Sequence, residues 1–337
     1  MADDSDRLVD FWKENDEERI VNMSLRPVGL DDFIGQKRVT DSLRIAIAAA
    51  KKREEPLEHI LLAGPPGLGK TSLAHCIAKE MGAKVTATSG PAIERAGDLV
   101  GILTSLEQGD ILFIDEIHRL SRTVEEFIYP AMEDYQIDFM VDKGPYAKSI
   151  KFNLKQFTLI GATTRKGFLS GPLRGRFGLF GDFDFYTPEE LTHIISRSAV
   201  RLSIVIDGQS ALEIAGRSRG SPRLANRLLK RVRDYAQVVH NGIIDPEVTA
   251  KALDSARIDT QGFDDLDRKY LTALIKLHNG GPAGIEAIAA SLSEDRGTLE
   301  DVVEPYLLEK GFILRSPKGR IATQYSYLHL GITYNRE

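Results

Sequence analysis

From Leu25 to Tyr186, short apolar runs alternate with stretches of helical periodicity. Four of these runs are continuous rather than alternating, which is typical of strands covered by helices on both faces. They are His59–Ala63, Lys84–Thr88, Ile111–Ile114 and Thr158–Ala162. Strands that alternate with helices in this way predict a parallel α/β sheet.

Beyond Tyr186 the pattern is helical as far as Arg257, and Pro188 and Pro222 each suit a first helical turn. The last block has three helical stretches followed by a short hairpin with a Pro-Lys-Gly turn, an order that predicts a winged helix. Its later elements are Ile285–Leu292, Leu299–Lys310 and the hairpin Phe312–Ala322. We therefore expect a mobile tail at 1–20, a large α/β domain at 21–186, a helical domain at 187–257 and a winged-helix domain at 258–337.

An insertion at about residues 136–155 has a different pattern, with period two on both sides of Gly144-Pro145. One face of its arms carries the apolar residues Ile137, Phe139, Val141, Ile150, Phe152 and Leu154. This alternation predicts a β-hairpin. The pattern leaves open whether the apolar face packs on the α/β domain or is covered by a partner protein.

Length and composition narrow the class of protein. A chain of 337 residues suggests two or three domains at roughly 100–200 residues each. No run approaches the ~18 apolar residues of a membrane span, and the acidic N-terminus lacks the apolar core of a secretory signal. Since Cys76 is the only cysteine, an intrachain disulfide and a cysteine zinc cluster are excluded, and we expect a cytoplasmic protein.

The net charge of −5 limits how the chain could meet nucleic acid. Proteins that coat nucleic acid usually carry a basic excess. Any DNA contact must therefore be a local basic patch or be delivered through a partner.

The clearest chemical motif is Gly64-Pro-Pro-Gly67-Leu-Gly69-Lys70-Thr71, which matches the pattern G-x-x-x-x-G-K-[ST]. Its glycines let the backbone curl so that N–H groups point at a phosphate, and the helix that begins near Lys70 adds partial positive charge. We expect Lys70 to reach the β- and γ-phosphates of ATP and the Thr71 hydroxyl to bind Mg²⁺. A fortuitous glycine-rich turn is the alternative, but the apolar strand before it and the helix after it argue against this.

Two acids, Asp115 and Glu116, end the third apolar run. Ligands of open α/β sheets bind at the carboxyl ends of the strands. We therefore expect Asp115 to hold the Mg²⁺ shell and Glu116 to polarise the attacking water. Taken alone, the pair could equally be a helix cap and a solvated charge.

Three later features suit phosphoryl transfer, in which positioning and charge neutralisation dominate. The hydroxyls of Thr163-Thr164 directly follow the fourth apolar run and could sense the γ-phosphate. Arg174 and Arg176 could act as a finger that reaches a neighbouring subunit's nucleotide, with surface ion pairing as the alternative. Arg223, at a helix start, could close onto the phosphates.

In this order the motifs resemble those of the AAA+ ATPases, and longer strings resemble one family of that class, the RuvB branch-migration motors of Holliday junctions. The strings are Leu25–Pro27, Phe33–Gln36, Leu112–Leu120, Tyr129–Tyr135, Leu159–Arg165 and Glu300–Leu307. The resemblance covers residues 20–330 or so. It implies an α/β P-loop AAA+ core with an all-α lid domain and a C-terminal winged-helix domain.

The resemblance also implies roles for single residues. Matching positions imply nucleotide contacts from Leu25, Arg26, Gly67, Gly69, Lys70, Thr71, Ser72, Tyr186 and Arg223, with Glu133, Asp134 and Tyr135 at a nucleotide interface shared between subunits. Arg176 matches the finger, and Arg174 is its close neighbour. Arg296 matches a family DNA contact.

The family's partners and activity follow from the same resemblance. Its members act as hexameric rings around duplex DNA, which implies ATP-driven branch migration of Holliday junctions in recombination and repair. The hairpin corresponds to one that docks on a RuvA-type junction-binding protein, and a RuvC-type resolvase works in the same pathway.

Charges in the last block predict which surface meets DNA. The third helix carries the acids Glu300, Asp301, Glu304 and Glu309, which would repel phosphates. From residue 311 to residue 336 there is no acid, whereas Arg315, Lys318 and Arg320 cluster on the wing. We expect sequence-independent contact with the DNA backbone through the wing, with merely solvated wing charges as the alternative.

Two other classes of protein can be weighed against the motor. A nucleotide-switched DNA-binding module of the replication-initiator type also joins an AAA+ core to a winged helix, and there ATP turnover is incidental. A protein-remodelling ATPase is not supported, because no aromatic-hydrophobic-glycine pore loop follows the second strand. Sustained, DNA-stimulated turnover would distinguish the motor from the switch.

Overall fold

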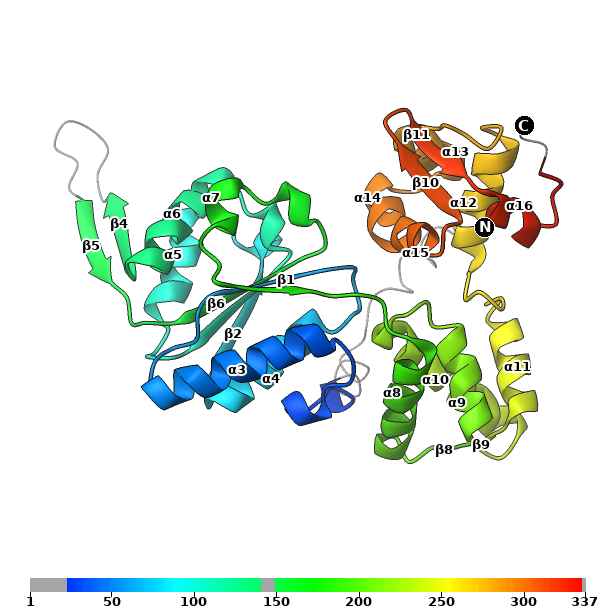
Figure 1. Cartoon of the computed structure of the whole chain (residues 1–337), viewed down its shortest axis with the longest axis horizontal. Coiled ribbons are helices and arrows are strands. Elements are labelled where there is room, and N and C mark those ends of the chain that lie inside the picture. The colour runs from blue at the N-terminus through cyan, green and yellow to red at the C-terminus, as the bar shows by residue number, and fades with distance from the viewer. Residues whose placement is uncertain (1–22, 141–148, 335–337) are drawn as a thin grey trace, which may run out of the picture.

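Three modules follow one another along the chain in the computed structural model (Figure 1). The structure describes residues 23–140 and 149–334. The expected tail at 1–20 and the tip of the expected hairpin, including Val141, lie outside the described residues. The first module is α/β, the second is helical, and the third combines short helices with a hairpin.

The α/β module is built on a parallel sheet of five strands in the order β2-β3-β6-β1-β7. The strands are β1 Ile60–Ala63, β2 Val85–Ser89, β3 Ile111–Asp115, β6 Thr158–Thr163 and β7 Leu179–Asp182. The four predicted strands are confirmed to within one residue at each end. The apolar pattern does not predict β7, because this edge strand exposes Phe180 and Asp182.

Helices cover both faces of this sheet. They are α3 Lys37–Arg53, α4 Lys70–Met81, α5 Ala96–Thr104, α6 Arg122–Glu133 and α7 Gly171–Arg174, with 3₁₀ turns at Leu30–Asp32, Gly90–Ala92, Ile117–Arg119 and Lys166–Phe168. In β3, Ile111 and Phe113 pack into the core on the α3 and α4 face, whereas Leu112 and Ile114 pack into the core on the α5 and α6 face. Because side chains alternate along a strand, covering both faces requires the continuous apolar run seen in the sequence.

The predicted hairpin is present and stands apart from the five-stranded sheet (Figure 1). Its strands, β4 Gln136–Met140 and β5 Ser149–Asn153, pair antiparallel with Ile137 opposite Phe152. Ile137 is fully buried against the α5 and α6 core, but Phe152 is 39% exposed. The base of the hairpin therefore packs on its own module through Ile137, while the ring of Phe152, opposite Ile137, is partly exposed.

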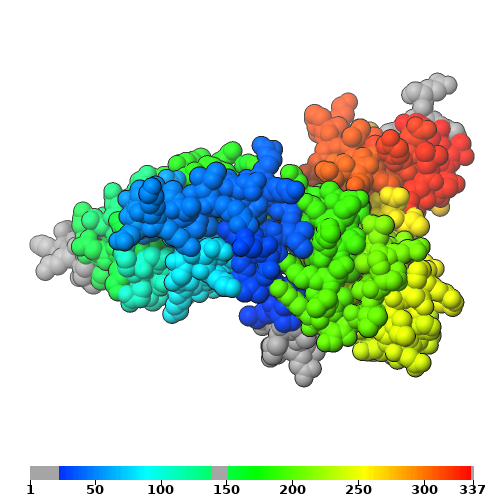
Figure 2. Space-filling view, turned by 60° about the horizontal axis from the view of Figure 1, so that its bottom comes forward, coloured from blue at the N-terminus to red at the C-terminus, as the bar shows by residue number. Residues whose placement is uncertain are grey.

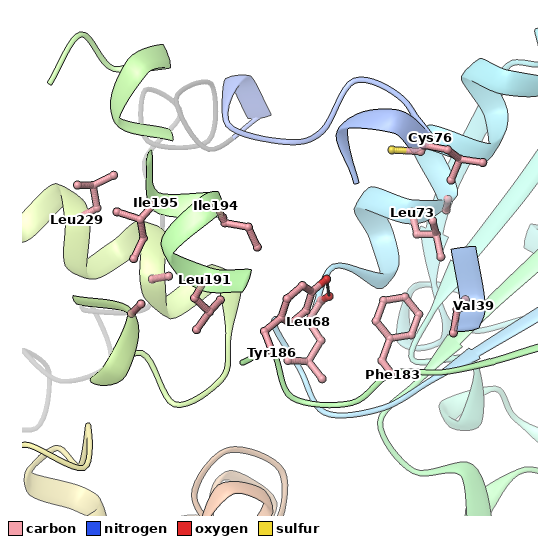
Figure 3. Packing of buried hydrophobic residues seen from close by; sticks show 14 of the residues in the cluster. Val39, Leu68, Leu73, Cys76, Phe183, Tyr186, Leu191, Ile194, Ile195 and Leu229 are labelled. Atoms are coloured by element: carbon pink, nitrogen blue, oxygen red, sulfur yellow. Dashed lines mark hydrogen bonds between the residues drawn. The ribbon is translucent and has the colours of Figure 1, made fainter. Parts of the chain in front are cut away.

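The helical module contains α8 Pro188–Arg201, α9 Gly208–Gly216, α10 Pro222–Val239 and α11 Pro246–Ser255, with the short parallel strands β8 Val205–Ile206 and β9 Ile243–Ile244. Its apolar core is continuous with that of the first module (Figure 3). Tyr186 lies at the junction, with Leu191 and Ile194 of α8 on one side and Leu68 and Phe183 on the other. This shared core places the helical module directly beside the loop that precedes α4.

The third module is a winged helix, as predicted. Its elements are α12 Asp265–Lys276, α13 Ile285–Leu292, α14 Arg296–Thr298, a π-helical turn Leu299–Val303, α15 Glu304–Glu309, β10 Ile313–Ser316, β11 Gly319–Ala322 and α16 Gln324–His329. A bridge between Ala283 and Arg320 adds a third arm to the hairpin. The module lies against the helical module in space-filling view (Figure 2). It also contacts the segment between the first two modules, since Phe185 meets Tyr306 edge-on with ring centres 5.8 Å apart.

Candidate active site

The phosphate-binding loop lies between β1 and α4, as predicted. Gly67 and Gly69 have φ angles of +80° and +99°, in a region that L side chains rarely adopt. Gly69 is the N-cap of α4, so the unpaired N–H groups of the first turn, which includes Thr71 and Ser72, lie beside the loop. A Cβ on Gly67 would lie 2.7 Å from Ser221 Oγ, so only glycine fits between the loop and the helical module.

Lys70 is buried at the mouth of this loop, with only 7% of its surface exposed. Its ammonium donates to the carbonyl oxygens of Gly64 at 2.7 Å and Pro65 at 2.8 Å. Burial lowers the pKa of Lys70 to about 8; the charge of Asp115 opposes this shift and the charge of Arg223 adds to it. The same ammonium therefore feels the acid at the end of β3 and the arginine of the helical module.

The two predicted acids lie at the carboxyl edge of the sheet. Asp115 ends β3, and its Oδ1 accepts the N–H of Glu116 at 2.9 Å. Glu116 has a φ of +48°, which turns the chain away from the strand, and its carboxylate pairs with Arg119 at 3.0 Å. Because β1 and β3 run in the same direction, the acids and the phosphate loop share one edge of the sheet.

The two threonines after β6 differ in environment. Thr163 is fully buried; its Oγ1 accepts the N–H of Arg165 at 3.0 Å and lies 3.0 Å from Nδ1 of His118. Burial lowers the pKa of His118, so the ring is neutral near pH 7. Thr164 lies just beyond the strand and is half-buried. The Thr163 hydroxyl is thus engaged inside the chain, whereas the Thr164 side chain is the more accessible of the two.

The helical module touches the phosphate loop directly. The N–H of Arg223 and the hydroxyl of Ser221 both donate to the carbonyl of Gly67, each at 3.3 Å. The buried Tyr186 hydroxyl donates to the carbonyl of Leu68 at 3.1 Å. The helical module therefore acts as a lid that is closed on the loop.

The segment before α3 completes this side of the site. Leu25 is 2% exposed, and the carbonyl of Arg26 accepts from Arg201 of α8 at 2.7 Å. Arg26 also contributes, after burial, to the lowered pKa of His75 on α4. The predicted nucleotide contacts at 25–26, in the loop and in the lid are thus gathered around the start of α4.

A cavity of about 120 Å³ opens beside the loop. Its walls come from the loop, the lid and the winged helix and include Pro65, Gly67, Arg219, Arg223, Arg227, Asp301 and Tyr306. All three modules therefore meet next to the phosphate loop.

A second group of predicted residues lies elsewhere, on α6 and α7. Arg176 donates to the carbonyl of Pro172 at 2.7 Å and to Glu133 at 3.2 Å, and its guanidinium lies 4.3 Å from the ring centre of Tyr129. Arg174 is exposed and forms no ion pair with any residue in the described part of the chain. These arginines contact their own helices and not the phosphate loop of the same chain.

The neighbouring segment is exposed except for its aromatic residue. Glu133 and Asp134 are exposed, whereas Tyr135 packs edge-on against Phe157 and His59 at ring distances of 5.8 and 6.3 Å. The two acids and the two arginines therefore mark one outer face of the α/β module.

The basic residues of the winged helix are largely paired within the module. Arg320 donates to Glu304 at 2.8 Å and to Glu300 at 3.1 Å, and its side chain is only 14% exposed. Arg315 also pairs with Glu304, which is fully buried. The predicted wing cations Arg315 and Arg320 are therefore not free charges, because acids of the third helix bind them.

Two further basic residues are more accessible. Arg296 is half-exposed and pairs with Glu286 at 2.8 Å and Glu300 at 3.2 Å. Lys318, at the turn of the wing, is exposed and forms no ion pair within residues 23–140 and 149–334. Of the wing cations, Lys318 is the one most freely presented to solvent.

Two arginines to which the sequence assigns no role connect the modules. Arg165 binds Asp301 through two hydrogen bonds of 2.8 and 2.9 Å. Arg219 of the lid binds Asp267 at 2.5 Å and the carbonyl of Val302 at 2.8 Å. Their partners lie 136 and 48 residues away in sequence, so no local pattern could reveal the pairing.

Fold and site together define a P-loop ATPase of the AAA+ class, with a helical lid and a winged helix. Three family models match in succession: the Holliday junction DNA helicase RuvB P-loop domain at residues 25–183, the RuvB AAA lid domain at 186–259 and the RuvB C-terminal winged helix domain at 260–331. The chain belongs to the RuvB family.

Individual relatives support this membership. The Holliday junction branch migration complex subunit RuvB of Desulfosudis oleivorans is 57% identical over 311 residues, which cover 92% of this chain and 91% of that relative. The solved structure of the Thermotoga maritima RuvB Holliday junction branch migration motor is 49% identical with a TM-score of 0.86, and the match covers 92% of this chain and 99% of that one. A point variant of the Thermotoga protein matches with 50% identity and the same TM-score of 0.86, with 92% and 99% of the two chains covered.

Within the described residues, no helix is long and apolar enough to cross a membrane.

Proposed function

We propose that this chain is an ATP-driven DNA motor that moves the branch point of Holliday junctions during recombination and repair. The observation that carries the proposal is the joining, in one chain of the RuvB family, of a phosphate loop, a lid that binds Gly67, and a winged helix that binds the lid through Arg219 and the α/β module through Arg165. The relatives from Desulfosudis and Thermotoga are named for this branch migration activity.

The site residues divide the chemistry of ATP hydrolysis among themselves. The Lys70 ammonium would leave the carbonyls of Gly64 and Pro65 for the β- and γ-phosphates, where its positive charge offsets the charge of the transferred group. Glu116 would orient and polarise the attacking water. Of the two threonines, Thr164 would meet the γ-phosphate, since it is the more accessible, and Thr163 would hold the strand end through His118.

The oxygen donors at this edge fit Mg²⁺. No group of three or more His, Cys, Asp or Glu side chains that could hold a metal was found in the described part of the chain. A hydroxyl from Thr71 and a carboxylate from Asp115 are the two protein groups expected instead, since Mg²⁺ usually keeps several waters and substrate phosphates as ligands. When bound, the ion neutralises charge on the phosphates.

The outer face of α6 and α7 supports a ring of subunits, and we propose a hexamer. Arg176 and Arg174 would reach the nucleotide of the adjacent subunit as a finger, beside Glu133, Asp134 and Tyr135 of the same face. Within the described residues, the side chain of Arg176 contacts Pro172, Glu133 and Tyr129 and not the phosphate loop of its own chain, which is consistent with a role at a neighbouring subunit.

DNA and partner proteins would meet the chain at its two extremities. The wing, with Lys318 at its turn, and Arg296 would contact the phosphate backbone of duplex DNA. The exposed Phe152 on the hairpin would dock on a RuvA-type junction-binding protein, since an apolar ring at a protruding strand needs cover. A RuvC-type resolvase would act on the same junction.

A synthetic four-way junction tests the proposal. The purified chain with ATP, Mg²⁺ and a RuvA-type protein should dissociate the junction into its branched products, and duplex DNA should stimulate sustained ATP turnover. Glu116→Gln should still bind ATP but lose both activities. A chain that binds DNA only when ATP is present, yet shows neither stimulated turnover nor junction movement, would instead be a nucleotide-switched binding module.

A further inference from the structure

Arg165 bridges the nucleotide module and the winged helix. It follows Thr164 directly, and its guanidinium holds Asp301 at 2.8 and 2.9 Å and Glu300 at 3.5 Å. The side chains of Arg165, Asp301 and Glu300 are 24%, 33% and 15% exposed. A bidentate and partly buried pair of this kind is stronger and more directional than an exposed one.

On the nucleotide side, Arg165 is tied to the acid that serves hydrolysis. Its backbone N–H donates to Oγ1 of Thr163, and that hydroxyl contacts His118 at 3.0 Å. His118 lies two residues after Glu116 on the 3₁₀ turn that leaves β3. A shift of Arg165 would therefore move the end of β6, including the accessible Thr164, relative to the water-polarising acid.

On the DNA side, Glu300 is shared among three arginines. Arg165 lies 3.5 Å from its carboxylate, Arg296 lies 3.2 Å away and Arg320 lies 3.1 Å away. Phosphates of bound DNA would compete with Glu300 for Arg296, whose side chain is 50% exposed, whereas Arg320 stays bound to Glu304. When DNA draws Arg296 away, the Glu300 carboxylate loses one positive partner and its attraction to Arg165 becomes stronger. Contact with DNA would therefore strengthen the ion pairs between the winged helix and Arg165.

We propose that Arg165 is a positioning residue that couples DNA contact at the winged helix to the ATP site through its ion pairs with Asp301 and Glu300. This inference rests on the proposed motor function, because it concerns how DNA stimulates hydrolysis. The physical path is continuous: it runs from DNA phosphates to Arg296, then to Glu300 with its neighbour Asp301, to Arg165 and to the end of β6.

A charge-pair experiment with the full chain tests the coupling. Asp301→Asn removes the bidentate partner of Arg165, keeps the size of the side chain and changes no group assigned to phosphate, Mg²⁺ or water, so the DNA-free ATPase rate should stay near that of the unaltered chain. The stimulation by saturating duplex DNA, expressed as the ratio of the two rates, should fall by about fivefold or more. Combining Arg165→Asp with Asp301→Arg restores a pair of opposite sign and should recover stimulation.

Two further variants keep the test decisive. Lys166→Ala removes a neighbouring pair, in which Lys166 holds Asp182 at 2.7 and 2.8 Å within the nucleotide module, and should leave the ratio unchanged. Arg165→Lys keeps the charge but not the two-pronged geometry, so its ratio should be intermediate; it replaces the Asp301 variant if that chain does not fold. Circular dichroism verifies folding in each case.

The outcomes separate the inference from the proposed function. Wild-type stimulation in Asp301→Asn, or a loss of stimulation that the swapped pair does not recover, would overturn the coupling role while leaving the motor intact. A fall of the DNA-free rate and the stimulated rate by the same factor would show a merely structural role and would also overturn it. Absence of stimulation in the unaltered chain would overturn the proposed function, and the coupling with it.

Discussion

The contact between lid and winged helix allows a stability prediction with a defined sign. Arg219 is 9% exposed and Asp267 is 1% exposed, and the arginine also donates to the carbonyl of Val302. Replacing Arg219 with methionine retains most of the apolar stem but removes both interactions. The buried carboxylate then has no positive partner as close as the arginine was, and the carbonyl loses its donor.

The size of the effect depends on pH. Burial raises the pKa of Asp267 from 3.8 to about 7, although Arg219 opposes the shift. Because the folded-state pKa is raised, the stability that the bound proton contributes is present at low pH and is lost as the pH rises through about 7. Removing Arg219 raises the pKa of Asp267 further, so at pH 8 the buried carboxyl of the variant keeps a proton that the unaltered protein releases. Arg219→Met should therefore cost about 2 kcal/mol at pH 8, from the lost hydrogen bond and about 1.4 kcal/mol for the one pH unit above 7. At pH 5.5 the acid is protonated, and the cost should be about 1 kcal/mol for the lost hydrogen bond.

Urea unfolding followed by circular dichroism at pH 8 and pH 5.5 measures this difference. Hydrogen exchange in peptides from α12, at one pH, would assign the affected transition to the winged helix. Arg233→Met is the matched control. Among the described residues, the ion-pair partner of Arg233 is the exposed Asp234 on α10, so this variant should lose less than about 1 kcal/mol. An equal loss at both pH values would refute the assignment of Asp267 as the titrating group.

Two further predictions concern the site and the hairpin. Since the pKa of Lys70 is about 8, the affinity for ATP should fall by up to about tenfold between pH 7 and pH 9 as the ammonium is lost. Titration with a fluorescent nucleotide should show no comparable fall in Lys70→Arg. An equal fall in both chains would contradict the role of this amine. Phe152→Asp should abolish binding to a purified RuvA-type protein in calorimetry while ATP hydrolysis persists. Lys151→Asp, one residue away on the opposite face of β5, should retain that binding, so loss in both would indicate a general effect of charge.

The parts of the fold that the sequence predicts are those specified by local pattern. Continuous apolar runs identify β1 and β3, and the loop and acids that follow them are contiguous strings whose chemistry is evident from residue type. Period-two alternation likewise identifies the hairpin at 136–155, because each arm carries the signal within a few residues. The edge strand β7 carries no such signal, since an edge position does not demand burial on both faces.

The charges show where sequence is insufficient. The sequence of the winged helix shows acids on the third helix and cations on the wing. It does not show which acid binds which cation, because that depends on how the chain folds. Arg320 meets Glu304 sixteen positions away, and Arg165 meets Asp301 across 136 positions. A residue that seems ready for DNA when considered alone can therefore be committed to an internal partner.

Glu304 gives the winged helix a mechanical property. This fully buried carboxylate accepts from Arg315 and Arg320 on opposite strands of the wing and from the Tyr270 hydroxyl of α12 at 2.9 Å. A hairpin of two four-residue strands would bend easily if it were attached by its ends alone. Because Glu304 ties both strands of the wing to α12, a force applied at the tip of the wing would be transmitted to the body of the domain instead of bending the hairpin.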